Sequence, residues 1–181
     1  MERSNTPADS FLALTLRSLR TPDAGILIFR IIFGAIMVAH GTQKLFGWFN
    51  GGGIEGTSKF FSTVGYPASS AMAILAGLTE TLGGMGIALG LFSAISGAAV
   101  LGTMANALWI SIPNGYMSGP GGVGYDLPLV LCAGAFTLIL TGPGMYSIDR
   151  LLRVGCIRSV NSPIWALIGL GVAVATLLSR G

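Results

Sequence analysis

Residues 26–46 form an apolar segment that is long enough to cross a membrane, and yet they include ionisable side chains. A transmembrane helix needs about 20 apolar residues. Arg30, His40 and Lys44 interrupt this segment, although a charged side chain at the centre of a bilayer costs roughly 2.5–3.5 kcal/mol on the lowest scales. At about 100° per residue, the three side chains fall within an arc of roughly 80°. One side of the predicted helix is therefore polar, and other parts of the chain must face it.

The composition is that of a membrane protein. Charged residues make up 9% of the 181 residues, whereas about 25% is usual in a soluble domain. This length has room for four or five spans but not for a separate soluble domain. The 28 glycines favour close helix contacts in lipid. The basic residues flank the apolar segments, which indicates membrane topology and a lipid bilayer as partner, with no nucleic acid.

Four further apolar segments follow the first. They lie at about 68–92, 94–112, 125–141 and 163–178. The sequence predicts an all-α integral membrane protein, a four-helix transmembrane bundle within 24–150 followed by a basic loop and a fifth transmembrane helix in 151–181. The last segment is near the lower length limit, so an interfacial or partner-bound helix is the alternative. Residues 1–23 predict a cytoplasmic amphipathic segment.

Polar residues in the connections predict helix caps and the orientation of the bundle. Thr57 or Ser58 is expected to cap one short helix, and Ser147 another. On one side of an alternating topology lie Arg3, Arg17, Arg20, Arg150, Arg153 and Arg158. Lys44, Lys59 and Arg180 lie on the other side. The excess of basic residues predicts a cytoplasmic N-terminus and an external C-terminus.

In this topology each of the first four spans contributes polar side chains, most of them at one depth. Toward the external ends of the spans lie His40, Gln43, Lys44, Asn106, Tyr125 and Asp126. Glu80 is near the midplane, and Arg30 is ten residues, or about 15 Å, from His40 on the inner side. One hypothesis is a structural network in which Glu80 pairs with Arg30 or Lys44. We favour a functional cavity that also uses this network, since ionisable residues within membranes mark sites and pathways.

Metal and disulfide chemistry are not indicated. The chain has a single histidine, His40, and two cysteines, Cys132 and Cys156, without a CxxC motif. Because the pKa of a histidine is near neutrality, His40 suits proton transfer better than metal binding.

A series of short motifs resembles the DoxX family of small bacterial membrane proteins over about residues 24–150. The motifs are Arg30, the HGTQKLFG run at 40–47, Gly52, Gly53, Gly56, Phe60-Phe61, Glu80 with Gly83-Gly84, Pro113-Asn114-Gly115, Tyr125-Asp126 and the GPGMYSID run at 142–149. The resemblance implies a four-helix bundle in the bacterial inner membrane. Members are commonly named oxidoreductases, and some are linked to quinone-coupled thiosulfate oxidation, to quinone and catechol resistance or to oxidative-stress complexes. This chain departs from the family in its fifth apolar segment and in Asp126, where the family usually has the longer Glu.

The leading hypothesis is a quinone-linked redox subunit. His40, Glu80 and Asp126 are the predicted proton-transferring, catalytic residues. The predicted substrate-binding residues are Arg30, Gln43, Lys44, Asn106 and Tyr125. The sequence has no flavin, haem or iron–sulfur motif. Electrons for a quinone or another lipophilic small molecule would therefore come from a soluble or membrane redox partner, or directly from a small reductant. The alternatives are a transporter or exporter of small organic or anionic molecules, and a scaffold that docks a soluble enzyme on loop 145–160.

Overall fold

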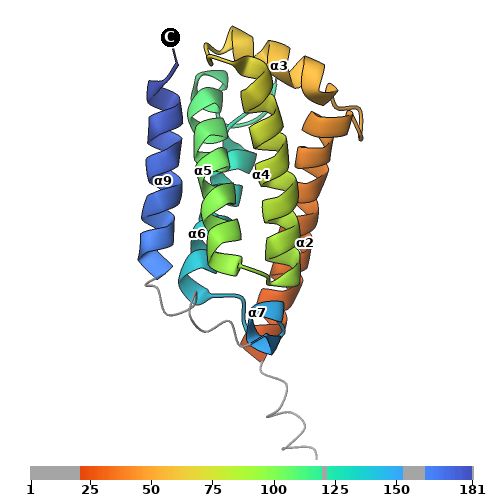
Figure 1. Ribbon diagram of the computed structural model, residues 1–181, viewed down its shortest axis with the longest axis vertical. Helices are drawn as coiled ribbons and strands as arrows, with labels where there is room; N and C mark the ends of the chain where they lie inside the picture. Colours follow the sequence, from red (N-terminus) through yellow and green to blue (C-terminus); the bar gives the residue numbers. More distant parts are fainter. Residues whose placement is uncertain (1–20, 120–121, 153–161, 181) are drawn as a thin grey trace, which may run out of the picture.

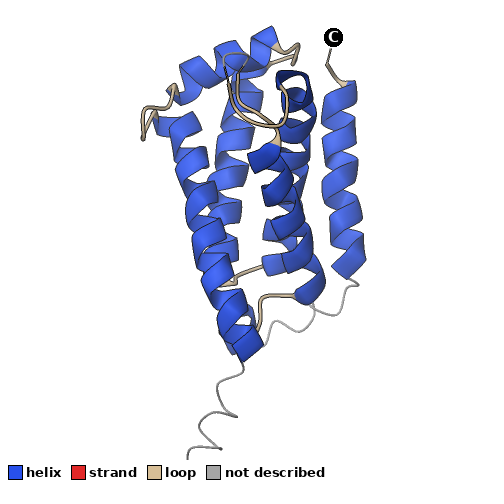
Figure 2. Cartoon of the chain, turned by 180° about the vertical axis from the view of Figure 1, so that it is seen from behind, coloured by secondary structure: helices blue, strands red, loops and turns tan. Residues whose placement is uncertain are grey.

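The computed structural model describes residues 21–119, 122–152 and 162–180, and within them the predicted helical bundle is confirmed. Five long helices run side by side along the long axis of the molecule (Figure 1). They are α2 (Thr21–Phe46), α4 (Ser69–Leu89), α5 (Ser93–Ser111), α6 (Asp126–Thr141) and α9 (Ser162–Leu178). Apart from one bridge between Gly119 and Gly122, the described residues contain no β-structure (Figure 2).

Three helical segments are long and apolar enough to cross a membrane: Pro22–Phe46, Ser69–Leu89 and Ser93–Asn114. α6 and α9 are apolar but shorter, at 16 and 17 residues. α9 lies along α5 in both views of the chain (Figures 1 and 2). A Cβ atom on Gly102 of α5 would lie 2.8 Å from the carbonyl oxygen of Gly169 of α9, so these backbones touch. The C-terminal apolar segment is therefore part of the bundle.

α2 and α4 pack against each other more closely than side chains would allow. A Cβ atom on Gly34 would lie 2.5 Å from the carbonyl oxygen of Gly84, and one on Gly84 would lie 2.8 Å from that of Gly34. Nearer the other end of α2, a Cβ atom on Gly41 would lie 2.7 Å from the carbonyl oxygen of Gly77. Small residues permit this approach in lipid, where no hydrophobic effect drives helices together.

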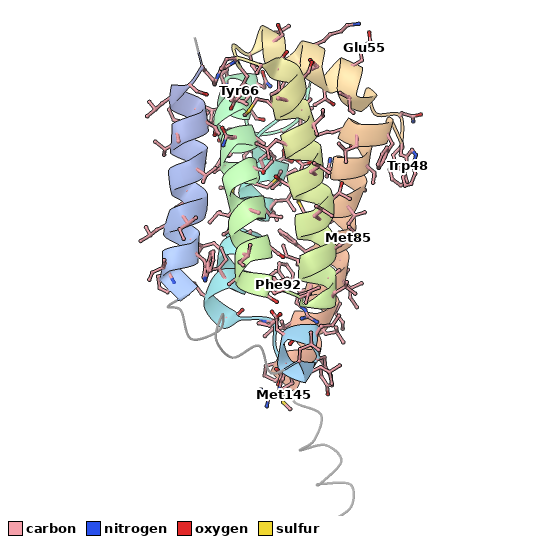
Figure 3. The ribbon with its side chains drawn as sticks, viewed as in Figure 1. Trp48, Glu55, Tyr66, Met85, Phe92 and Met145 are labelled. Atoms are coloured by element: carbon pink, nitrogen blue, oxygen red, sulfur yellow. The ribbon has the colours of Figure 1, made fainter. Side chains whose placement is uncertain are left out.

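A short helix, α3 (Gly53–Thr63), lies across the end of the bundle where α2 stops (Figure 1). We call this the α3 end; the opposite end carries α7 (Ile148–Leu151) and is the α7 end. Phe46, Trp48, Phe49 and Phe60 are exposed at the α3 end, and Trp48 points away from the bundle (Figure 3). Aromatic residues are enriched where a membrane meets water. α3 thus has the composition of an interfacial helix.

The apolar core lies between the long helices. Its buried members include Phe33 and Met37 of α2, Ile87 of α4 and Leu138 and Ile139 of α6. Met104 and Leu131 belong to the same core cluster and also line the cavity described next.

Candidate intramembrane site

A cavity of about 640 Å³ lies among α2, α3, α4, α5, α6 and α9. It is lined by five of the polar residues that the sequence singles out: His40, Gln43, Lys44, Glu80 and Asn106. Most of the remaining lining is apolar, from side chains such as Met104, Leu127 and Leu131. An apolar pocket with a few convergent polar groups is the usual form of a small-molecule site.

The polar centre of the cavity is an ion pair between Lys44 and Glu80. The Nζ atom of Lys44 lies 2.6 Å from Oε2 of Glu80. Nζ also donates to the carbonyl oxygen of His40 at 3.4 Å. The Glu80 side chain is 1% exposed and that of Lys44 is 28% exposed. Of the two partners that the sequence allows for Glu80, the structure selects Lys44 and not Arg30.

The local sequence explains how this pair forms. His40 and Lys44 are four residues apart, so both lie on the same side of α2. Gly41, between them, packs on Gly77 of α4, and Glu80 follows Gly77 by one helical turn. The close glycine contact therefore brings the Lys44 ammonium group within reach of the Glu80 carboxylate.

Asn106 connects three elements on the α9 side of the cavity. Its Nδ2 atom donates to the carbonyl oxygen of Gly102 at 3.0 Å. Its Oδ1 atom accepts from the Tyr66 hydroxyl at 2.7 Å and from Thr176 Oγ1 at 3.1 Å. Tyr66 lies at the α3 end (Figure 3), where Arg180 stacks on its ring with the guanidinium carbon 5.4 Å from the ring centre. Burial raises the pKa of Tyr66 and the charge of Arg180 opposes this rise, so the hydroxyl stays a donor at neutral pH.

Sequence reasoning missed two residues of this link, Tyr66 and Thr176. Both also line the cavity. Tyr66 follows Phe60 and Phe61 in a stretch that is typical of a membrane interface, and Thr176 stands in an apolar run. No local pattern distinguishes them, because both donate to Asn106 of α5 and these contacts depend on how distant parts of the chain pack together.

Three of the predicted site residues do not join the cavity. Asp126 begins α6 and its amide donates to the Tyr116 carbonyl oxygen at 3.0 Å, while the Tyr125 ring packs edge-on against the Tyr116 ring at 5.3 Å. α6 faces the cavity through its following residues, Leu127, Pro128 and Leu131. The third residue, Arg30, lies at the α7 end.

Arg30 does not line the cavity. It lies at the α7 end of the bundle, where it contacts the segment 142–151. Its side chain is 1% exposed, and Nη2 donates to the Tyr146 carbonyl oxygen at 2.6 Å. Nearby, the Asp149 carboxylate accepts from the amides of Phe92 and Ser93 at 2.7 and 2.9 Å and from Ser93 Oγ at 2.7 Å. The segment 142–151 is thereby fastened to the start of α5. The Asp149 carboxylate thus satisfies the free amides at the start of α5.

The cavity has the groups needed for acid–base chemistry on a lipophilic molecule. Lys44 can donate to a carbonyl or oxyanion, Glu80 can hold or release a proton, and His40 lies in the same wall. Within the described residues, no three His, Cys, Asp or Glu side chains come together as a metal site would need.

Comparison with known proteins agrees with this architecture. Residues 25–112 match the sequence model of the DoxX family. The chain is 28% identical over 131 residues to "Inner membrane protein YqjF" of Escherichia coli, a match that covers 72% of this chain and 94% of that protein. It is 30% identical over 134 residues to "Putative oxidoreductase CatD" of Bacillus subtilis, covering 74% of this chain and 90% of that protein. No solved structure matches. The chain belongs to the DoxX family of membrane proteins.

Proposed function

We propose that the cavity binds the head group of a quinone and that the chain is the membrane subunit of a quinone-linked oxidoreductase or of a quinone and oxidative-stress detoxification system. The observation that carries this proposal is the Lys44–Glu80 pair, which lines an otherwise largely apolar cavity at 2.6 Å separation. A charge pair inside a membrane bundle is costly, which favours a functional reason for it.

The residues of the cavity match the chemistry of quinone reduction. A quinone that accepts two electrons must also take up two protons to become a quinol. The Lys44 ammonium group would stabilise negative charge on the quinone oxygen, and Glu80 and His40 would deliver protons to it. The two electrons come from a separate redox partner, soluble or membrane-bound. The name of the Bacillus subtilis relative supports an oxidoreductase role.

The proposed location is the bacterial inner membrane, with the N-terminus in the cytoplasm. The name of the Escherichia coli relative supports the inner membrane. The distribution of basic residues supports the orientation, because positively charged loops remain in the cytoplasm. In this orientation the α3 end and the cavity face the outer leaflet.

Binding is tested with the purified protein in lipid nanodiscs and a short-tailed ubiquinone analogue, detected by native mass spectrometry and titration. We expect the wild type to retain the quinone and the Glu80→Gln variant to lose it. Glu55→Gln is the matched control, since Glu55 is an exposed carboxylate on α3 whose side chain is 83% exposed. Retention that is equal in wild type and Glu80→Gln, or absent from the wild type, contradicts the proposal.

A further inference from the structure

The cavity is not confined to the interior of the bundle, because it also includes one outer stripe of α5. Ile95, Ala99, Thr103, Asn106 and Ile110 line it, and their spacing of three or four residues places them on one face of the helix. Met104 and Ser111 also line the cavity but lie on a different face of α5. The cavity therefore touches α5 both on the side of the ion pair and on an outer side.

α5 lies between α4 and α9 (Figure 1). α9 meets α5 through Gly102 and Gly169, and α4 meets it where a Cβ atom on Gly83 would lie 2.8 Å from Val100 Cγ2. The stripe falls between these two contacts on the helix circumference. It is the floor of a groove whose walls are Met72, Leu75 and Thr79 of α4 and Ile168, Val172 and Thr176 of α9. We call this the α4–α9 groove.

The α4–α9 groove is open to lipid along its length. Leu75 of α4 is 54% exposed, and Ile168 and Val172 of α9 are 47% and 56% exposed. The floor residues Ala99 and Thr103 are small, so the floor lies below the level of the walls. A bilayer would surround these side chains on a spanning bundle, and the groove faces it.

Small side chains connect the α4–α9 groove with the ion pair. Near the α7 end, α4 and α5 are in tight contact, since a Cβ atom on Gly86 would lie 3.0 Å from the Cβ atom of Ser96. Nearer the α3 end, the small residues Ala76 of α4 and Ala107 of α5 both line the cavity. Glu80 is one helical turn from Ala76. The cavity thus passes between α4 and α5 beside the carboxylate.

We infer that the α4–α9 groove holds the prenyl or alkyl tail of the quinone whose head group lies at Lys44 and Glu80. This inference rests on the proposed function and specifies its substrate as a membrane-soluble, long-tailed quinone that enters between α4 and α5. α9 supplies one wall of the groove, although it lies beyond residues 25–112, which match the family. Ile168 and Val172 are accordingly specificity-determining positions of this chain.

The shape of the cavity favours a tail over other occupants of the α4–α9 groove. The groove and the polar centre belong to one cavity, so one molecule can occupy both. A cavity of about 640 Å³ can hold a head group and part of a flexible tail, whereas it is too small for a helix of a partner protein, which is about 10 Å wide. Thr57, Phe60 and Phe61 of α3 line the cavity at its membrane-surface end, and the exposed groove walls on the lipid side favour the bilayer as the route of entry.

Photolabelling of the full-length protein in liposomes tests the inference. The probe is a benzoquinone with an alkyl tail that carries a diazirine, and labelled peptides are mapped by mass spectrometry. We expect label on Leu75, Ile168 and Val172, and its loss when an unlabelled quinone with the same head and tail competes. Ala99→Phe fills the floor of the groove and should abolish this label. Ala133→Phe, at an exposed position of α6 outside the cavity, should leave it unchanged.

A second variant guards against a folding defect in Ala99→Phe. Ile168→Trp changes a half-exposed side chain on the groove wall and should likewise abolish the label. Label that persists in both variants, or that spreads equally over the lipid-facing side of α2 and α6, overturns the tail site. A complete absence of label from the groove, as expected if a partner helix occupies it, also overturns the tail site.

A probe with the same tail and diazirine but a phenyl head separates the two proposals. Groove label from the phenyl probe that no quinone competes away would contradict the quinone function while the groove remains a tail site. Quinone retention that depends on Glu80, together with label outside the groove, would contradict the tail site while the proposed function stands.

Discussion

Lys44 and Glu80 are 36 positions apart in the sequence, and their side chains meet with Nζ 2.6 Å from Oε2. The two residues are not equivalent in burial, since the Glu80 side chain is 1% exposed and that of Lys44 is 28% exposed. The carboxylate depends on the ammonium group for its charge partner, whereas the ammonium group also reaches the open cavity. Removal of Lys44 should therefore affect the stability of the protein differently from removal of Glu80.

We predict that Lys44→Met destabilises the protein more than Glu80→Gln does. The first change leaves a buried carboxylate without a charge partner, a loss of about 3–5 kcal/mol for buried pairs. The second leaves Lys44 able to turn toward the cavity. Thermal unfolding in detergent measures the difference. The double variant should recover part of the stability lost in Lys44→Met; equal losses in the two single variants would show that the burial difference has no energetic effect.

Two glycines of α9 provide a matched test of how this helix is held. A Cβ atom on Gly169 would collide with the carbonyl oxygen of Ala98, whereas one on Gly171 would meet no atom within 4 Å. Gly169→Ala should therefore separate α9 from α5 and lower the unfolding free energy by about 1–3 kcal/mol. Gly171→Ala should be neutral or slightly stabilising. Thermal unfolding and size-exclusion chromatography check both; equal behaviour would contradict the backbone contact of α5 with α9.

The long helices were predictable because apolar length is a local property. The predicted segment 68–92 became Ser69–Leu89, and 125–141 became Asp126–Thr141. Ser147 accepts from the Arg150 amide at 3.3 Å as predicted. The cap at Thr57 or Ser58 was wrong, because the helix begins at Gly53 and both residues lie inside it. The helix begins within the glycine-rich run that precedes them, and Gly52 at its N-cap provides no side-chain hydrogen bond.

The candidate site was predictable only in part. Periodicity places His40 and Lys44 on one side of a helix, and the cavity wall includes both. The sequence also places Arg30 on the inner side, about ten residues from His40, but it does not show that Arg30 donates to the Tyr146 carbonyl oxygen. That contact depends on the path of segment 142–151, which no local pattern fixes. The α4–α9 groove was not predicted, because one of its walls is α9 and the sequence does not show where α9 packs.

Asp149 is predicted to hold the α7 end together. Its carboxylate accepts from two amides and a hydroxyl at the start of α5, and Asp149→Ala leaves these donors without an acceptor. We expect a loss of about 1–2 kcal/mol, the range for a helix cap, and faster hydrogen exchange at Phe92 and Ser93. Glu55→Gln, which breaks an exposed pair on α3, is the control and should cost less than about 1 kcal/mol. Unchanged exchange at Phe92 would contradict the role of Asp149.

The orientation of the bundle is predicted to place the α3 end outside the cell. In a background with Cys132→Ala and Cys156→Ser, the variants Lys59→Cys and Arg150→Cys place single thiols at the α3 and α7 ends, at side chains that are exposed. A membrane-impermeant maleimide should label the Lys59→Cys variant in intact cells and the Arg150→Cys variant only after permeabilisation, because loops rich in Arg stay in the cytoplasm. The reverse pattern would move the cavity to the inner leaflet. Labelling of both variants in permeabilised cells confirms that each thiol is reactive, so a negative result in intact cells reports the side of the membrane.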